Sequence, residues 1–233
     1  MGSARKKRLV VLTGAGISAE SGIKTFRDTG GLWENYRVED VATPEAWERN
    51  PAMVQEFYNA RRRELYKAQP NTAHFALAEA EKMFEIQIIT QNIDDLHERA
   101  GSSHVLHLHG ELKKSRSSKD PNAIFNIEGP DLHIGDLAPD GSQLRPHVVW
   151  FGEAVPNITQ ASNMAKSADL FAVVGSSLNV YPAAGLLFYV PKNIPTFLVD
   201  PKNVTTPGNR HVEVIQEVAS VGVPIMLKRL EAL

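Results

Sequence analysis

The sequence predicts an α/β fold built on an open parallel sheet that carries two insertions. Short apolar runs, each ending in small or polar residues, recur along the chain, as is typical of strands buried on both faces. The first run leads into a glycine-rich turn, which favours a strand-to-helix crossover. Residues 29–71 and 111–144 interrupt this rhythm, because the first stretch lacks any strand pattern and the second is dominated by polar turn signals.

The composition limits the function classes. With 233 residues, 42% of them hydrophobic, the chain is long enough for one domain with a sizeable core. A formal charge of −2 gives no general attraction to nucleic acid or membranes. No apolar run reaches the roughly 20 residues that span a bilayer, and no secretory segment stands apart from the first strand, so we expect a cytoplasmic location. The absence of cysteine excludes disulfides, cysteine-ligated zinc and a thiol nucleophile.

The first predicted strand, residues 9–12, is followed by a turn of the dinucleotide-binding type. Gly14, Gly16 and Ala19 fit the pattern G-x-G-x-x-G/A. In that pattern the first glycine permits a tight turn, the second lets the backbone approach a pyrophosphate, and the third small residue lets the helix pack closely. A turn without a ligand would show the same glycines. The polar residues that follow, and the cation of Arg27, favour the ligand-binding interpretation.

The rest of a dehydrogenase site is missing. Such a site needs a second buried strand that ends in an acidic residue about 20 residues further on. Residues 32–47 of this chain do not have a strand pattern. The sequence therefore indicates a dinucleotide-binding turn in a protein that is not organised like a dehydrogenase.

The first insertion, residues 29–71, is predicted to be helical. Residues 43–44 and 50–51 each pair a capping residue with a proline, which suits the first position of a helix. The second pair opens a long helix that ends at about Lys67. Because no strand pattern occurs in this stretch, we expect the helices to lie over the sheet.

The parallel sheet resumes after this insertion. Asn71 caps a helix that ends at about Phe84, and residues 86–90 form the next strand. Apolar runs and proline or glycine boundaries predict the later elements. They are a short helix at 94–101, strands at 105–108, 170–174, 195–199 and 212–215, and helices at 182–190 and from about 220 to the C-terminus.

Small and polar residues gather at the carboxyl ends of the predicted strands, where ligands bind in an open parallel sheet. These ends are Gly14–Gly16, Gln91–Asp94, His109, Gly175–Ser177 and Asp200. Each could be an ordinary loop, but five such ends at one edge indicate a site. His109 is the best-placed general base, because imidazole titrates near neutral pH. We expect the neighbouring His107 to face a helix layer.

Five segments of the chain then carry a family pattern: GAGISAESGIKTFR, TQNIDDLHERAG, HLHGEL, RPHVVWFGE and GSSLNVYPAAGL. In this order they resemble the sirtuin family of NAD-dependent protein deacylases, from about Lys7 onward. The resemblance implies a single domain, residues 1–233, with a Rossmann-like larger part and a smaller part. The larger part would be residues 8–28, 72–110 and 145–233. The smaller part would be the helical insertion, 29–71, and a second, normally zinc-binding insertion, 111–144.

The resemblance also implies an activity and its residues. Sirtuins consume NAD, transfer the acyl group of an acylated lysine to ADP-ribose and release nicotinamide. His109 would be the catalytic base, with Asn92 also catalytic, and protein substrates would pair with Val149, Phe151, Gly152 and Glu153 as an added strand. Asp200 stands where many sirtuins have Asn. The implied NAD-binding residues are Gly14, Ala15, Gly16, Ser18, Phe26, Arg27, Trp33, Gln91, Asn92, Ile93, Asp94, Gly175, Ser176, Ser177, Asp200, Pro201, Lys202 and Ala219.

The second insertion departs from the family pattern. Ser115, Ser117 and their neighbours stand where the zinc thiolates of sirtuins would be, and His133 is the only candidate ligand. One histidine does not hold a tetrahedral zinc ion, so we predict that the protein binds no zinc. The smaller part would then be held by apolar contacts from Ile124, Phe125, Ile127 and Leu132.

Tyr58 and Arg61 suggest which acyl groups are removed. Sirtuins that prefer succinyl- or malonyl-lysine carry a Tyr-x-x-Arg pair on the helix that lines the acyl pocket, and these two residues match it. Residues three apart share a helix face, and the arginine can bind a carboxylate through two hydrogen bonds. Alternatively, Arg61 is one of three solvated arginines, 61–63. We expect a class III, bacterial-type enzyme that removes succinyl and malonyl groups and also acetyl groups.

Three other functions stay open on the sequence alone. One is a plain NAD-dependent deacetylase, in which Tyr58 and Arg61 have no special role. Another is a non-catalytic NAD-binding sensor, in which His109 is structural. The third is a hydride-transferring dehydrogenase, which the missing second strand disfavours. We expect a monomer that acts on acylated protein substrates, without nucleic-acid or membrane partners.

Overall fold

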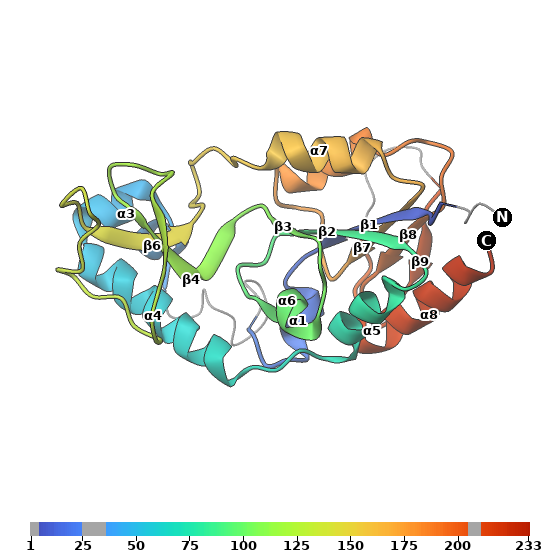
Figure 1. Ribbon diagram of the computed structural model, residues 1–233, viewed down its shortest axis with the longest axis horizontal. Coiled ribbons are helices and arrows are strands. Elements are labelled where there is room, and N and C mark those ends of the chain that lie inside the picture. Colours follow the sequence, from blue (N-terminus) through green and yellow to red (C-terminus); the bar gives the residue numbers. More distant parts are fainter. Residues whose placement is uncertain (1–4, 25–35, 205–210) are drawn as a thin grey trace.

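The structure is a computed structural model that describes residues 5–24, 36–204 and 211–233. The molecule is elongated and has two parts (Figure 1). One part holds a large sheet with helices on both faces, and the other holds a long helix and a small sheet. None of the helices in the described ranges has both the length and the apolar character needed to cross a membrane.

The large sheet has six parallel strands in the order β3-β2-β1-β7-β8-β9, which confirms the predicted α/β fold. From β1 the chain proceeds to β2 and β3 on one side and later returns to β7, β8 and β9 on the other. The neighbours β1 and β7 therefore flank a topological switch point, where ligands bind in doubly wound sheets. The strands are β1 Arg8–Thr13, β2 Glu85–Thr90, β3 Val105–His107, β7 Leu170–Val174, β8 Thr196–Val199 and β9 Glu213–Ile215.

Helices cover both faces of this sheet (Figure 1). Helices α5, Thr72–Ala80, and α8, Ala219–Glu231, pack against one set of alternating strand residues, and helix α7, Ile158–Lys166, and the 3₁₀ helix η2, Ala183–Tyr189, pack against the other. Burying each large aliphatic side chain in these layers contributes about 1.5–3 kcal/mol. Two short helices, α1 Gly16–Ala19 and α6 Leu96–Ala100, follow β1 and β2.

The first insertion is helical over its described residues, as predicted, but the expectation that its helices lie over the large sheet was wrong, because their apolar side chains pack with Leu112 of β4 and Val148 of β6 instead (Figure 1). It forms α2 Val38–Val41, α3 Pro44–Arg49 and α4 Pro51–Lys67. The side chains of Thr43 and Asn50 accept hydrogen bonds from the first turns of α3 and α4, both at 3.1 Å. These caps satisfy backbone N–H groups that have no partner inside a helix, which explains why both helices begin where the sequence indicated.

The second insertion contains strands where we expected only loops. Strand β4, Gly110–Ser117, pairs antiparallel with β5, Ile124–Asn126, and with β6, Leu144–Val148. The expectation failed because the buried positions near the end of β4 are the polar residues 115–117, so no apolar alternation is visible. Residues 145–153, which we assigned to the larger part, begin with β6 and so start in the small sheet.

Polar contacts organise this insertion in addition to the apolar contacts we expected from residues such as Ile127 and Leu132, which are both buried. The Ser117 hydroxyl donates to Asp140 at 2.8 Å and lies 2.7 Å from the Ser142 hydroxyl. Leu132 is buried as expected, but Ile124 is 43% exposed and cannot be a core residue. The expectation of an apolar core was therefore wrong at Ile124.

Arg62 of α4 holds the insertion against the helix. Its side chain is fully buried, with an exposed fraction of 0%. It donates to the carbonyl of Leu112 at 2.7 Å, and to the carbonyl of Pro130 and the side chain of Asn59 at 2.8 Å each. Asn59 in turn bonds both backbone groups of Leu132 at 3.0 Å. Because buried acceptors need donors, this pair fixes strand β4 and residues 130–132 on the helix.

Replacing Arg62 with Met should destabilise the protein strongly. The substitution keeps much of the volume but leaves buried acceptors without donors, so the free energy of unfolding should fall by roughly 3 kcal/mol. Urea unfolding measures it. Arg63→Met is the matched control, because Arg63 pairs with Glu56 and Asp131 at the surface and should change stability little. Equal effects of the two substitutions would contradict the role of Arg62.

Candidate active site

Two backbone segments cross at the switch point, and only glycines fit there. Gly16 donates its N–H to the carbonyl of Gly175 at 2.9 Å, so the β1–α1 turn touches the end of β7. A Cβ added at Gly175 would lie 2.3 Å from the nitrogen of Ile17, and one added at Gly14 would lie 2.7 Å from the Gly175 oxygen. Gly175 also has φ +62°, a conformation that other residues adopt at a cost. The glycine pattern thus has a steric reason.

Three side chains from two elements form a buried polar cluster beside this crossing. Asn92, after β2, donates to the carbonyl of Gly14 at 3.1 Å and to the hydroxyl of Ser18 at 3.2 Å. The Ser18 hydroxyl donates to Asp94 at 2.9 Å. Burial raises the pKa of the Asp94 carboxyl. The cluster joins the β1–α1 turn to the end of β2, as expected of neighbouring strand ends.

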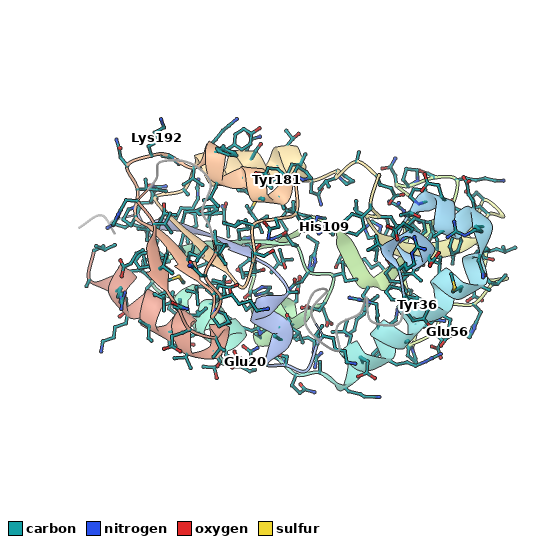
Figure 2. The ribbon with its side chains drawn as sticks, turned by 180° about the vertical axis from the view of Figure 1, so that it is seen from behind. Glu20, Tyr36, Glu56, His109, Tyr181 and Lys192 are labelled. Atoms are coloured by element: carbon teal, nitrogen blue, oxygen red, sulfur yellow. The ribbon has the colours of Figure 1, made fainter. Side chains whose placement is uncertain are left out.

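His109 lies between the two parts of the molecule (Figure 2), immediately before β4. Its Nδ1 is 2.9 Å from the backbone carbonyl of Gln91. Because a carbonyl only accepts, Nδ1 carries the hydrogen, and in the neutral ring Nε2 is the unprotonated, basic nitrogen. Burial lowers the pKa of His109, so the neutral ring predominates at pH 7.

His107 has a different environment, as we expected. Its Nδ1 is 3.0 Å from the carbonyl of Asn92, and its Nε2 is 2.8 Å from the Glu98 carboxylate. Both ring nitrogens are therefore engaged within the protein. The residue supports the turn that carries Asn92 and is not placed as a base.

The remaining strand ends carry further residues of the predicted site. The Ser176 hydroxyl accepts from the Gln91 side chain at 2.8 Å, while Ser177 is exposed. Asp200, after β8, is buried and accepts from the backbone of Lys202 at 2.9 Å. The exposed Pro201 lies beside it. Gln91 and Ser176 are thus brought together with the glycine crossing.

The N-terminus of α8 is linked to the end of α1 by hydrogen bonds of its second residue. Ala219 is buried at the start of the helix. The next residue, Ser220, donates its backbone N–H and hydroxyl to the carboxylate of Glu20 at 2.9 and 2.6 Å. Figure 2 shows Glu20 at the end of the α1 segment. The C-terminal end of α1 is therefore joined to the first turn of α8.

Helix α4 brings Tyr58 and Arg61 towards the site. The buried Tyr58 hydroxyl accepts from the indole nitrogen of Trp150 at 3.0 Å. The Arg61 guanidinium lies 5.5 Å from the centre of the Phe57 ring. Burial lowers the pKa of Arg61 to about 10, whereas its attraction to Tyr58 and Asp94 favours the charged form. Arg61 is therefore a cation at neutral pH, close enough to Asp94 to interact with it.

Residues 149–153 follow β6 and lead away from His109. Val149 donates its N–H to the carbonyl of His109 at 2.9 Å, and Phe151 donates to the carbonyl of Ala42 at 3.0 Å. The Phe151 side chain is 52% exposed, and Gly152 has φ +90°. The segment connects the catalytic candidate to the first insertion.

The Glu153 carboxylate has partners that the sequence did not suggest. It accepts from Arg116 at 2.8 Å, from Arg145 at 2.9 Å and from the backbone N–H of Trp150 at 2.8 Å. Sequence reasoning missed Arg116, Arg145 and Trp150 as members of the site region. Arg145 and Trp150 lie in the RPHVVWFGE segment of the family pattern, which was an available signal, whereas no such segment contains Arg116.

Three residues of the predicted NAD site, Phe26, Arg27 and Trp33, lie outside the described residues. Their assignments stay predictions. Ala15 and Gly16 are half-buried in the turn, and Ile93 is half-buried between Asn92 and Asp94.

The second insertion does not fit a zinc ion. Over the described ranges, no group of three or more His, Asp or Glu side chains could hold a metal. Ser117, at one of the positions where a thiolate would stand, already donates to Asp140 and accepts from the backbone N–H groups of Lys119 and Asp120 at 3.0 and 2.9 Å. His133 is exposed. These contacts give the segment a folded alternative to metal ligation.

Comparison with known proteins identifies the family. The model of the Sir2 family matches residues 14–182. A Bacteroides thetaiotaomicron protein named NAD-dependent protein deacylase is 57% identical over 222 residues, or 93% of this chain and 95% of that protein. The chain belongs to the Sir2 family. This Sir2 protein is also 55% identical over 213 residues to a Helicobacter pylori protein of the same name, covering 91% of this chain and 93% of the relative.

Solved Sir2 structures share the fold. A Sir2 homologue in complex with NAD superposes with a TM-score of 0.87 at 38% identity, covering 97% of this chain and 90% of that one. A Sir2 complex with a p53 peptide and NAD⁺ gives a TM-score of 0.79 at 26% identity, covering 98% and 95% of the two chains. The resemblance found in the sequence is thereby confirmed at the level of family and fold.

Replacing Gly175 with Ala should test the crossing in this Sir2 protein. The added Cβ would adopt a strained backbone conformation and push on the β1–α1 turn, so the free energy of unfolding should fall by roughly 3 kcal/mol. Gly129→Ala is the control, because Gly129 also has a positive φ, +84°, but nothing lies within 4 Å of its added Cβ. Urea unfolding of both variants distinguishes crowding from conformation. Similar decreases in the free energy of unfolding for the two variants would mean that the close backbone contact at Gly175 adds no penalty beyond the strained backbone conformation.

Proposed function

We propose that this protein is an NAD-dependent protein-lysine deacylase. The observation that carries the proposal is the state of His109, a half-buried neutral imidazole with Nδ1 bonded to Gln91 and a basic Nε2. His109 lies after the end of β3, at the same edge of the large sheet as the glycine crossing and Asn92. The names of the relatives and the NAD and peptide complexes among the structural neighbours support the same function.

NAD is a co-substrate in this proposal. It supplies a ribose carbon from which nicotinamide can leave and which the oxygen of the acyl-lysine attacks. His109 Nε2 then takes a proton from a ribose hydroxyl, and that oxygen attacks the carbon of the former acyl group. Water then adds to the same carbon, and the bond between this carbon and the lysine nitrogen breaks as the amine takes up a proton. The products are the free lysine, nicotinamide and O-acyl-ADP-ribose, with one water consumed. The protein's contribution is orientation and a correctly protonated base.

The polar cluster is suited to the nicotinamide end of NAD. Asn92 and Asp94 are fixed by Ser18 and Gly14, so their free hydrogen-bonding capacity has a defined direction. Gln91 is held by Ser176 and supports His109 through its carbonyl. We assign Asn92 a catalytic role beside His109 on this basis.

The glycine crossing is suited to the pyrophosphate and the adenosine. At Gly14, Gly16 and Gly175 no side chain separates the backbone from a ligand. We assign Ala15 and Ser177 to the same surface. The adenosine end of NAD is assigned to Asp200, Pro201, Lys202 and Ala219. The nicotinamide end is assigned to Ile93. Phe26, Arg27 and Trp33, which lie outside the described residues, also belong to the proposed NAD site.

Protein substrates would bind along residues 149–153. Val149, Phe151 and Gly152 connect His109 with the first insertion, and the side chain of Phe151 is exposed. We propose that their backbone pairs with the substrate as an added strand. Glu153 contributes through its backbone or by shaping the turn, because its carboxylate is occupied by two arginines.

We further propose that acidic acyl groups are preferred over acetyl. Tyr58 is buried and Arg61, one turn further along α4, is half-buried. Burial raises the pKa of Tyr58 to about 12, while Arg61 keeps its charge at pH 7. A succinyl or malonyl carboxylate would meet a neutral O–H donor and a guanidinium. The alternative is a plain deacetylase. The smaller part, 29–71 and 111–144, would form one wall of this pocket, extended by β6.

The function is tested first with one lysine peptide carrying acetyl, succinyl or malonyl groups. Mass spectrometry would follow NAD-dependent formation of O-acyl-ADP-ribose. Faster loss of the acidic groups supports the complete proposal, and faster loss of acetyl rejects the preference only. No turnover would favour an NAD-binding sensor, and a reduced nicotinamide absorbing in the near ultraviolet would indicate a dehydrogenase. A cytoplasmic location and a monomeric state stay predictions.

Replacing His109 with Ala should lower deacylation by about 10²-fold or more, because the general base is removed. For the unmodified protein, kcat/KM, which reports the protonation state of the free enzyme, should fall as pH decreases and Nε2 becomes protonated. The midpoint should lie below the ordinary imidazole value of about 6.5, because burial lowers the pKa of His109. His133→Ala, at an exposed position, is the control and should keep the profile. An unchanged rate in His109→Ala would disprove the assignment.

Replacing Arg61 with Met should change acyl selectivity. Removal of succinyl should become at least about tenfold slower, because a charged hydrogen bond worth roughly 1.5–3 kcal/mol is lost, while removal of acetyl should change much less. The ratio of the two kcat/KM values measures the effect. Arg63→Met is the control, since Arg63 forms surface ion pairs on the same helix. Equal loss of both activities would reject a carboxylate-binding role for Arg61.

A further inference from the structure

Trp150 is buried under Tyr58 and contacts four groups at once. Its exposed fraction is 2%. The indole nitrogen donates to the Tyr58 hydroxyl at 3.0 Å, and the backbone N–H donates to Glu153 at 2.8 Å. The Arg145 guanidinium carbon lies 3.5 Å from the ring centre, and the Trp47 ring centre lies 5.9 Å away. The Trp150 ring is therefore held by Arg145 on its face and by Tyr58 at its nitrogen, while Glu153 holds the backbone of the residue.

The direction of the Trp150–Tyr58 hydrogen bond is fixed by chemistry. An indole nitrogen can only donate, so the Tyr58 hydroxyl must accept in this bond. The hydrogen of that hydroxyl is then left to donate to another group. Burial raises the pKa of Tyr58 to about 12, so the hydroxyl keeps its hydrogen at pH 7. By donating to the Tyr58 oxygen from one side, Trp150 thus determines the direction in which the Tyr58 O–H group can donate.

Glu153 and two arginines keep the indole in place. The carboxylate accepts from both Arg116 and Arg145, which are buried, and from the Trp150 backbone. Arg145 also donates to the carbonyl of Val148 at 3.1 Å. Charge-assisted hydrogen bonds are stronger than neutral ones, and a guanidinium over an indole adds a cation–π contact. The turn at 150–153 is consequently rigid where it carries Trp150.

We propose that Trp150 is a positioning residue for acyl-chain selectivity, which acts by holding the Tyr58 hydroxyl so that its hydrogen donates to the carboxylate of an acidic acyl group. The inference rests on the proposed function, since it requires Tyr58 and Arg61 to form the acyl pocket. Trp150 itself does not touch the acyl group in this proposal. An acetyl group has no carboxylate and needs no such donor, so the effect is selective.

Trp150→Phe tests the proposal, because it keeps an aromatic ring for Arg145 and Trp47 but removes the N–H. Steady-state rates would be measured with acetyl- and succinyl-lysine peptides of one sequence. We expect KM for the succinyl peptide to rise about tenfold with little change in kcat, and the acetyl peptide to be affected less than about threefold. A parallel fall with both peptides would indicate a merely structural residue and would overturn the proposal.

Three further variants, two single and one double, make the result specific. Trp47→Phe changes the aromatic neighbour of Trp150 without removing its hydrogen bond, and should leave the succinyl-to-acetyl ratio unchanged. Tyr58→Phe should lower succinyl removal, and adding Trp150→Phe to it should cause no further selective loss, because the two residues act through one bond. Additive selective losses in the double variant would overturn the proposal.

Failure of the inference can be separated from failure of the proposed function. If Tyr58→Phe leaves succinyl removal unchanged, both the acyl pocket and the role of Trp150 are rejected. If Tyr58→Phe is impaired and a folded Trp150→Phe is not, only the role of Trp150 is rejected. Thermal unfolding shows whether Trp150→Phe is folded. Should it not fold, Glu153→Gln loosens the backbone anchor of Trp150 and should shift the same ratio in the same direction, and an unchanged ratio would overturn the proposal.

Discussion

The close contact between the β1–α1 turn and the end of β7 is the constraint on which the rest of the site depends. Gly14, Gly16 and Gly175 let two backbones meet at hydrogen-bonding distance, at the point where the strand order reverses. Any side chain there would separate the strand ends. Because the sheet is buried on both faces, the turn cannot move aside without disturbing the packing of β1 and β7.

Backbone carbonyls extend this constraint to Asn92 and His109, the proposed catalytic residues. The carbonyl of Gly14 accepts a hydrogen bond from the Asn92 side chain, and the carbonyl of Gln91 accepts one from Nδ1 of His109. A carbonyl of a strand end has a fixed position, so it selects one tautomer and one ring orientation of the histidine. In this protein the sheet, through its main chain, sets the protonation pattern of His109 more than any neighbouring charge does.

Much of this arrangement could be predicted from the sequence, since the strands of the parallel sheet are apolar runs and Thr43 and Asn50 mark helix starts by capping. Residues at strand ends were correctly brought to one edge, because parallel strands share an edge. Strand β4 could not be recognised, because the buried residues at its end are polar and find partners far away in the chain. Trp150 and Arg145 were missed for the same reason: their importance comes from contacts with Tyr58 and Glu153 that no local pattern encodes.

Helix α4 has two neighbouring faces with different tasks. Asn59 and Arg62 bind backbone groups of residues 112, 130 and 132. Tyr58 accepts from Trp150, and Arg61 is close enough to Asp94 to interact with it. A helix transmits displacement along its length as a nearly rigid body. A substitution in the loop at 130–132 that displaces Arg62 would therefore also displace Tyr58 and Arg61 on the same helix. For the acyl pocket proposed above, substrate range would then respond to changes in a loop outside the pocket lining.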